Sequence, residues 1–242
     1  MRLAQYIALT GYCSRRTASR LIRDGRVRIE QRQANHIDQI NLVKTEQGQQ
    51  ASQAIYIDNQ PLGVVETKQY WVLNKQVGTD CRLLPQDPCS LLHLLPKQPR
   101  LYPVGRLDKD SRGLLLLTND GELTHKLMHP DFSHSKRYQV QLNRPYDDHF
   151  LQQMAAGVSY KNLTTLPCQV QRLTDDRFEI ILTQGLNRQI RRMSLALGYK
   201  VIDLKRCSIE TLQLGDLPPG GMRPLSQVEV NTLLVVTKNP QK

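Results

Sequence analysis

The chain has 242 residues, of which 39% are hydrophobic and 23% are charged, and its formal net charge is +11 at pH 7. This length allows one large or two compact globular domains, and the strongly basic balance favours a polyanionic partner, nucleic acid before membrane, over a merely basic globular protein. No apolar stretch approaches the about 20 residues that span a bilayer, and residues 1–11 lack the apolar core of a secretion signal, so a cytoplasmic protein without a membrane partner is expected.

Residues 1–30 predict two short helices followed by a strand. The first helix carries apolar residues on one face and ends at Gly11. Ser14 is placed as the N-cap of the second helix, which ends before Gly25. The strand follows at residues 27–29. Together these elements form a compact pattern and predict a small unit at the start of the chain.

The polar face of the second helix is crowded with arginines. Residues 1–30 contain seven arginines against Asp24 and Glu30, which gives this segment five of the eleven net positive charges. Like charges one turn apart on a helix repel by roughly a few tenths of a kcal/mol per pair, and bound phosphates would offset that repulsion. A solvated basic face is the alternative. The arginines expected to contact phosphates are Arg15, Arg16, Arg20 and Arg23.

This N-terminal segment resembles the S4 RNA-binding domain. The resemblance is carried by two helices, by Ser-Arg-Arg at 14–16 and by Asp-Gly-Arg-Val at 24–27. It extends over residues 2–60, where Ala-Ile-Tyr-Ile at 54–57 predicts the closing hairpin strand. The sequence departs from the family at 30–33, where Glu-Gln-Arg-Gln replaces the usual Asn-Gly hairpin, and the following Gln-rich stretch is longer than usual.

From Tyr70 onward, predicted strands and helices follow one another in irregular order. Such an order favours an α+β fold with a mixed sheet over a regularly alternating one. The strands are expected at 70–73, 114–117, 137–142 and 178–183, and the helices at 122–129, 144–156 and 188–197.

Histidine and cysteine usage predicts no metal site and no disulfide framework. His125 and His129 share a predicted helix at a spacing that can bind a metal, and His134 follows. No glutamate completes a His-Glu-x-x-His pattern. The five cysteines include no Cys-x-x-Cys pair, so reduced thiols are expected.

The segment Gly-Arg-Leu-Asp-Lys-Asp-Ser-Arg-Gly at 105–113 is the most informative part of the chain. Four leucines at 114–117 follow it, then an Asn-Asp-Gly turn at 119–121. This pattern predicts a short strand buried on both faces, preceded by a polar loop. The loop holds Asp108 against the edge of a core. Spacing alone leaves Asp108 open as a structural ion-pair partner or as a catalytic group, whereas Asp110 is expected to be structural.

Two later segments carry further candidate residues. In Lys-Arg-Tyr-Gln-Val at 136–140, Tyr138 is on its own pattern an ordinary half-buried strand tyrosine. In Gln-Gly-Leu-Asn-Arg-Gln-Ile-Arg-Arg-Met at 184–193, Asn187 is placed to cap a helix. A helix N-terminus with nearby arginines favours a phosphate, although a solvated basic face is again the alternative.

Together the three segments resemble, in order, the motifs of the RsuA/RluB/RluE/RluF family of RNA pseudouridine synthases, most closely the RluF branch. The resemblance implies a catalytic domain with a mixed, largely antiparallel sheet flanked by helices. It also implies that Asp108 is the catalytic carboxylate, as nucleophile or as base, that Tyr138 stacks on the target uracil, and that Arg191 pairs with the carboxylate. The further expected RNA contacts are Gly105, Arg106, Leu107, Asn187, Arg188, Gln189 and Ile190.

The implied reaction is the isomerisation of uridine to pseudouridine in structured RNA, with the uridine flipped out of its helix. No redox or group-transfer step occurs, so no cofactor is expected. The RluF branch acts on large-subunit ribosomal RNA, and a transfer RNA activity is associated with it. We expect a monomer with an S4-like domain at 1–60, a linker at 61–69, a catalytic domain at 70–238 and a disordered tail at 239–242.

Two rival functions belong to other classes. A non-catalytic RNA-binding ribosome-assembly factor would share the basic N-terminal segment, but it would not need Asp108, Tyr138 and Arg191 together. An RNA hydrolase would need paired metal-binding carboxylates or a histidine pair in a defined context, and the sequence offers neither.

Overall fold

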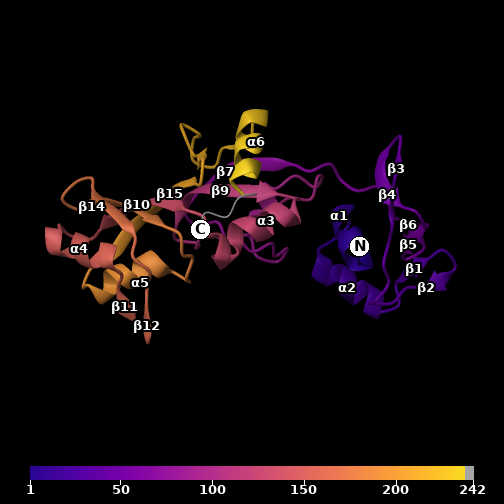
Figure 1. The fold of residues 1–242 in the computed structure, drawn as a ribbon, viewed down its shortest axis with the longest axis horizontal. Coiled ribbons are helices and arrows are strands. Elements are labelled where there is room, and N and C mark those ends of the chain that lie inside the picture. The colour runs from indigo at the N-terminus through magenta and orange to yellow at the C-terminus, as the bar shows by residue number, and fades with distance from the viewer. Residues whose placement is uncertain (238–242) are drawn as a thin grey trace. The chain divides into compact units, whose positions relative to one another are not determined.

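The computed structural model describes residues 1–237 and divides them into two compact units (Figure 1). Unit 1 comprises Met1–Gln69 together with Pro96–Leu101, and unit 2 contains Tyr70–Leu95 and the chain from Tyr102 onward. The tail predicted at 239–242 lies outside the described residues. Over the part of the chain that is described, no helix combines the length and the apolar character needed to cross a membrane.

Unit 1 begins with the two predicted helices, α1 (Leu3–Leu9) and α2 (Arg15–Arg23). The predicted N-cap of α2 is confirmed, because the Ser14 hydroxyl accepts a hydrogen bond from the backbone N–H of Thr17 at 3.1 Å. Gly25 follows α2 with a φ of +72°, a left-handed conformation that glycine adopts without steric cost. The arginines therefore lie on a helix with fixed ends.

A four-stranded sheet of order β2-β1-β5-β6 packs with these helices around one apolar core. The predicted strand at 27–29 is confirmed, and the strand predicted at 54–57 is present as β5. The Gln-rich stretch forms a separate hairpin of β3 and β4 that the sequence did not predict. The strands are β1 (Val27–Ile29), β2 (Arg32–Gln33), β3 (Leu42–Thr45), β4 (Gly48–Ala51), β5 (Ile55–Ile57) and β6 (Gln60–Pro61).

Unit 2 is built on a nine-stranded sheet whose main path is β13-β14-β10-β15-β9-β7-β17, with β16 paired to β15 and β8 to β9. Only β9 and β15 run parallel, so the expected mixed, largely antiparallel sheet is confirmed. Strands β11 (Ser159–Tyr160) and β12 (Leu163–Thr164) form a separate hairpin. The sheet strands are β7 (Tyr70–Lys75), β8 (Tyr102–Pro103), β9 (Arg112–Thr118), β10 (Lys136–Leu142), β13 (Gln169–Arg172), β14 (Arg177–Leu182), β15 (Val201–Ile209), β16 (Leu212–Gln213) and β17 (Met222–Pro224).

Helices cover the sheet through two apolar clusters. One cluster joins α4 and α5 to β10, β14 and β15, and Figure 1 shows these helices beside that half of the sheet. The other joins α3 and α6 to β7, β9 and β15. The helices are α3 (Gly121–Met128), α4 (Asp148–Ala156), α5 (Gln189–Ala196) and α6 (Gln227–Val236), with short 3-10 turns at Leu91–Leu94 and Pro130–Phe132.

Strand β9 is the buried strand that the four leucines predicted. Leu114, Leu115, Leu116 and Leu117 are all 0% exposed, and because neighbouring side chains point to opposite faces, both faces of β9 are covered. Gly113, at its start, has a φ of +102°, and a Cβ there would lie 2.3 Å from the backbone oxygen of Arg206. Only glycine allows β9 and β15 to approach this closely.

The helix predicted at 144–156 starts later than the periodicity indicated. Helix α4 begins at Asp148, because Asp147 acts as the N-cap and its carboxylate accepts from the N–H of Phe150 at 2.9 Å. The preceding residues are not helical, and the hydroxyl of Tyr146 donates to the backbone oxygen of Arg177. An N-cap aspartate in a run of polar residues was the missed signal.

Candidate active site

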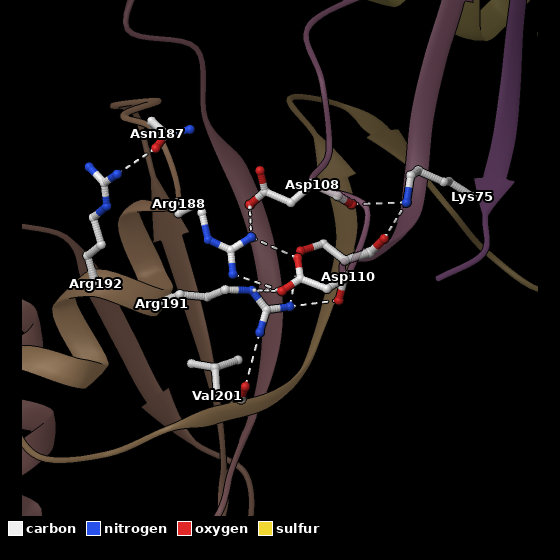
Figure 2. A network of polar contacts seen from close by, with 9 residues as sticks. Lys75, Asp108, Asp110, Asn187, Arg188, Arg191, Arg192 and Val201 are labelled. Atoms are coloured by element: carbon white, nitrogen blue, oxygen red, sulfur yellow. Dashed lines mark hydrogen bonds and ion pairs between the residues drawn. The ribbon is translucent and has the colours of Figure 1, made fainter. Parts of the chain in front are cut away.

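Asp108 lies in the loop between β8 and β9, and a buried lysine holds the backbone of that loop. The Lys75 ammonium donates to the carbonyl oxygens of Asp108 at 3.0 Å, Ser111 at 2.6 Å and Gln76 at 3.0 Å. Lys75 is 1% exposed, and burial lowers the pKa of its amine. Because the acceptors are backbone oxygens, these bonds fix the path of the loop independently of its side chains (Figure 2).

Arg191, from α5, is the second anchor of this loop. Its guanidinium donates to the backbone oxygen of Asp110 at 2.7 Å, to the Ser111 hydroxyl at 3.3 Å and to the backbone oxygen of Val201 at 3.0 Å. Its Nε lies 3.4 Å from a carboxylate oxygen of Asp110, an ion-pair contact without hydrogen-bond geometry. Burial lowers the pKa of Arg191. The side chain thus ties α5 and β15 to the Asp108 loop.

The expected pairing of Arg191 with Asp108 takes a different form in the structure. Arg188 makes two hydrogen bonds to the carboxylate of Asp110, at 3.0 and 2.8 Å, and its Nη1 lies 3.6 Å from Asp108 Oδ2 (Figure 2). These hydrogen bonds lower the pKa of Asp110. Arg191 reaches the loop backbone and Asp110, so the cation in ion-pair contact with Asp108 is Arg188.

The start of α5 also differs from the prediction. Arg188, not Asn187, is the N-cap, and it has a left-handed backbone with a φ of +53°. The Asn187 side-chain oxygen instead accepts from Arg192 Nη2 at 2.7 Å. The predicted end of the helix is confirmed, since Gly198 follows α5 with a φ of +86°. The left-handed turn is what directs Arg188 toward the two carboxylates.

A cleft of about 340 Å³ opens beside Asp108. Nine of the predicted residues line it and come from all three sequence motifs: Gly105, Arg106, Leu107, Asp108, Tyr138, Asn187, Arg188, Gln189 and Ile190. Arg191 does not line the cleft. The four arginines of α2 belong to unit 1. The structure therefore brings the three motifs of unit 2 together at one concave surface.

Tyr138 belongs to the floor of this cleft, on β10. It is half-buried, and it stands directly opposite Arg206 of β15 in the antiparallel ladder. Leu182 and Leu204 line the same floor from the two strands that flank β10. A flat ring bound in the cleft would find an aromatic face and aliphatic side chains there, with the Asp108 carboxylate, 32% exposed, beside them.

Two cationic residues of the cleft were missed by the sequence interpretation, Lys136 on β10 and Arg206 on β15. Both are buried. Burial, and next the charge of Arg206, lower the pKa of the Lys136 amine to about 8, which Glu210 partly opposes. For Lys136 the signal was available, because it is two residues before Tyr138 and so shares its strand face.

The arrangement suits chemistry on a flat heterocycle next to a carboxylate. Asp108 is the only carboxylate among the described residues that line the cleft, and four cations line it as well: Arg106, Lys136, Arg188 and Arg206. Among the described histidine, cysteine, aspartate and glutamate side chains, no group of three or more is arranged to hold a metal ion. The cleft can bind a group that combines an uncharged ring with neighbouring anionic oxygens.

In unit 1, the arginines of α2 form an exposed basic face. Arg15, Arg16, Arg20 and Arg23 are all exposed, whereas Arg32, elsewhere in unit 1, is paired with Asp38 at 2.9 Å. Within residues 1–237, none of the four α2 guanidinium groups forms an ion pair. Their charges are therefore available to an external anion.

Comparisons with known proteins agree with this geometry. A family model described as RNA pseudouridylate synthase matches residues 69–196, and one for the S4 domain matches residues 1–39. The chain is 34% identical over 241 residues to the dual-specificity RNA pseudouridine synthase RluF of Escherichia coli K12, covering 99% of this chain and 80% of that protein. It is 33% identical over 247 residues to ribosomal large subunit pseudouridine synthase B of Bacillus subtilis, covering 96% and 95%.

A solved structure agrees as well. The crystal structure of a pseudouridylate synthase is 30% identical in sequence, covers 96% of this chain and 99% of that chain, and superposes with a TM-score of 0.68. The similarity therefore extends over both units and is not confined to the motifs.

Proposed function

The chain belongs to the RNA pseudouridylate synthase family and isomerises uridine to pseudouridine in RNA, and from this premise we propose that Asp108, Tyr138 and Arg191 serve that reaction in the cleft of unit 2. The observation that carries the proposal is the convergence of the three sequence motifs around one carboxylate. Intact catalytic side chains also disfavour the alternative of a non-catalytic ribosome-assembly factor.

The reaction breaks the bond between C1′ of the ribose and N1 of uracil, turns the base, and rejoins it through C5. A base stacked inside a helix is out of reach of any side chain, so the uridine must be flipped out. Tyr138 provides the ring on which the flipped uracil stacks, and Asp108 acts at the ribose or the base as nucleophile or as base. Arg106, exposed beside Asp108, fills the vacated space or holds a flanking phosphate.

Arg191 acts in this proposal as a positioning residue. It donates hydrogen bonds to the backbone oxygen of Asp110 and to the hydroxyl of Ser111, and it does not line the cleft. Arg188 is then the cation in ion-pair contact with the Asp108 carboxylate, at 3.6 Å. The remaining cleft residues, Gly105, Leu107, Asn187, Gln189 and Ile190, shape the site around the nucleotide.

We further propose that large-subunit ribosomal RNA is the substrate, with a transfer RNA as a second one, and that the enzyme works as a monomer in the cytoplasm. The support for the substrates is the similarity to a dual-specificity synthase and to a ribosomal large subunit synthase. No cofactor is required, because the product is an isomer of the substrate.

Two measurements test the proposed function. Pseudouridine mapping of ribosomal and transfer RNA from cells with and without the gene should show at least one uridine that is modified only when the gene is present. Purified protein should then release tritium from C5 of uridine in an unmodified transcript of the same RNA. A map identical in both strains, with no tritium release, would contradict the proposal.

The arginine face of α2 should control the salt dependence of RNA binding. Changing Arg15, Arg16, Arg20 and Arg23 to Gln should lower the slope of log affinity against log salt by about 0.7–0.9 for each phosphate that is no longer bound. Fluorescence anisotropy with structured RNA at several salt concentrations measures the slope. Arg32→Gln is the matched control, because Arg32 already pairs with Asp38. An unchanged slope in the fourfold variant would mean that this face only contacts solvent.

A further inference from the structure

Two buried cations lie together on the floor of the cleft without a carboxylate partner. Lys136 is 9% exposed and Arg206 is 3% exposed. Lys136 and Tyr138 are two residues apart on β10, and Arg206 stands opposite Tyr138 on β15, so the three side chains share one face of the sheet. Among the described residues, neither cation forms an ion pair.

Both cations retain hydrogen-bonding capacity that the fold does not use. The Lys136 ammonium, which has three donors, donates to the backbone oxygen of His134 at 3.1 Å. Arg206 Nε donates to the backbone oxygen of Leu114 at 2.7 Å, whereas its Nη2 is buried and has no partner among the described residues. A buried donor without a partner destabilises the folded protein, and a hydrogen bond to a ligand oxygen would offset that cost.

The nearest acidic groups are already engaged. Glu210 is bound by the backbone N–H of Ser135 and by the Nδ1 of His134, at 3.2 Å from the latter. Asp108 is in ion-pair contact with Arg188. Neither carboxylate forms an ion pair with Lys136 or Arg206, so the unused donors of the floor are available to an acceptor oxygen of a ligand.

The surroundings of the two cations favour an oxygen on a flat apolar ring over a phosphate. Leu182, Leu204 and the Tyr138 ring lie beside them on the floor. A phosphate keeps much of its hydration, and the exposed arginines at the rim, Arg106 and Arg188, suit it better. A carbonyl oxygen of a base that stacks on Tyr138 can reach the floor while its ring faces contact the leucines.

We propose that Lys136, supported by the charge of Arg206, donates a hydrogen bond to a carbonyl oxygen of the flipped uracil and stabilises the negative charge that the base gains during isomerisation. This inference rests on the proposed function. When the C1′–N1 bond breaks, its electron pair stays with uracil and spreads over the ring and its carbonyl oxygens. C5 then bonds to C1′, the C5 proton leaves and N1 takes up a proton, so the base returns to neutrality.

The stabilisation should be largest while the base carries its extra electron pair, and it should therefore accelerate the chemical step more than it strengthens RNA binding. The two carbonyl oxygens of the ring are equivalent for this argument. The proposal does not depend on whether Asp108 attacks covalently or acts as a base, because the uracil gains negative charge in either case.

The test compares Lys136→Met with Lys136→Arg in single-turnover assays at saturating RNA, with tritium release from a 5-labelled transcript as the readout. Lys136→Met should slow the reaction about 100-fold, a reduction typical of removing one oxyanion donor. Its melting temperature should stay equal or rise, because a buried, incompletely paired ammonium is replaced by an apolar side chain of similar length. Lys136→Arg should recover a substantial part of the rate.

The pH profile adds a readout that a structural role would not change. The kcat/KM of the wild type should decline as the pH rises through about 8, where Lys136 loses its proton. The charged groups that act on its ammonium are Arg206 on β15 and Glu210 after β15, and the ammonium itself donates to the backbone oxygen of His134 before β10. Lys136→Arg should remove this decline, because arginine keeps its proton over this pH range. Since both enzymes act on the same RNA, a decline that only the wild type shows cannot come from titration of the uracil.

Lys205→Met is the matched control, since Lys205 precedes Arg206 on β15 and faces the opposite side of the sheet. Its rate should remain within about threefold of the wild type. The inference is overturned if Lys136→Met keeps the wild-type rate, or if it weakens only RNA affinity, or if its slower rate merely follows a lower melting temperature. A wild type that releases no tritium from any RNA would instead refute the proposed function.

Discussion

Asp108→Asn should slow pseudouridine formation by at least about a thousandfold, or about 4 kcal/mol of activation free energy. Asparagine has nearly the same size, but it can serve neither as nucleophile nor as base. The Asp108 side chain is 32% exposed, and the loop is held through backbone carbonyls, so the substitution should leave the fold intact. Tritium release under single-turnover conditions gives the rate, and melting temperature and RNA affinity should stay near the wild-type values.

Asp110→Asn is the matched comparison for this prediction. Asp110 has the same chemistry two residues away, but its carboxylate is engaged by both hydrogen bonds from Arg188. Its removal should reduce the rate by about tenfold through less accurate positioning. If Asp108→Asn stays within tenfold of the wild type, or if Asp110→Asn is the more damaging change, Asp108 is not the catalytic carboxylate.

Arg191→Met should lower kcat about 100-fold and change KM little. The substitution removes the hydrogen bonds to the Asp110 and Val201 carbonyls and to the Ser111 hydroxyl, so the Asp108 loop loses one of its two anchors. A shift of about 1 Å in a catalytic group is enough for a reduction on the order of 100-fold. Steady-state kinetics on the mapped RNA separates the two constants.

The same variant should also melt at a lower temperature, because the exposed Asp110 carbonyl and the partly buried Val201 carbonyl lose a hydrogen bond, at about 0.5–1.5 kcal/mol each. Arg192→Met is the control, since Arg192 donates to the Asn187 side chain and not to the loop. It should keep nearly the wild-type kcat. A variant of Arg191 in which only KM rises would identify that arginine as a phosphate ligand and contradict its role as a loop anchor.

The elements with strong local signals could be predicted from the sequence. Four leucines between a glycine-bounded loop and an Asn-Asp-Gly turn specify a strand with two covered faces, and β9 has that character. Ser14 and Gly25 specify the ends of α2 because capping depends on one or two residues. The cleft residues within the three motifs could be named because each motif is contiguous.

The long-range partners could not be predicted in the same way. Lys75 holds a loop 33 residues further along the chain, and it does so through carbonyl groups that every residue possesses. Arg206 reaches the cleft because β15 runs parallel to β9, a pairing of strands that lie far apart in the chain and that local patterns do not encode. Arg188 turns toward Asp108 through a left-handed backbone at a residue that is not glycine.

Because Lys75 and Arg191 hold the Asp108 loop mainly by its peptide oxygens, the position of Asp108 depends little on the identity of neighbouring side chains. The exposed residue at 106 can therefore be exchanged without displacing the carboxylate that we propose as catalytic. On the proposed role of Asp108, we expect that changing a few rim residues redirects one scaffold to new uridines. An engineer who wished to retarget the enzyme should vary that rim and leave both anchors untouched.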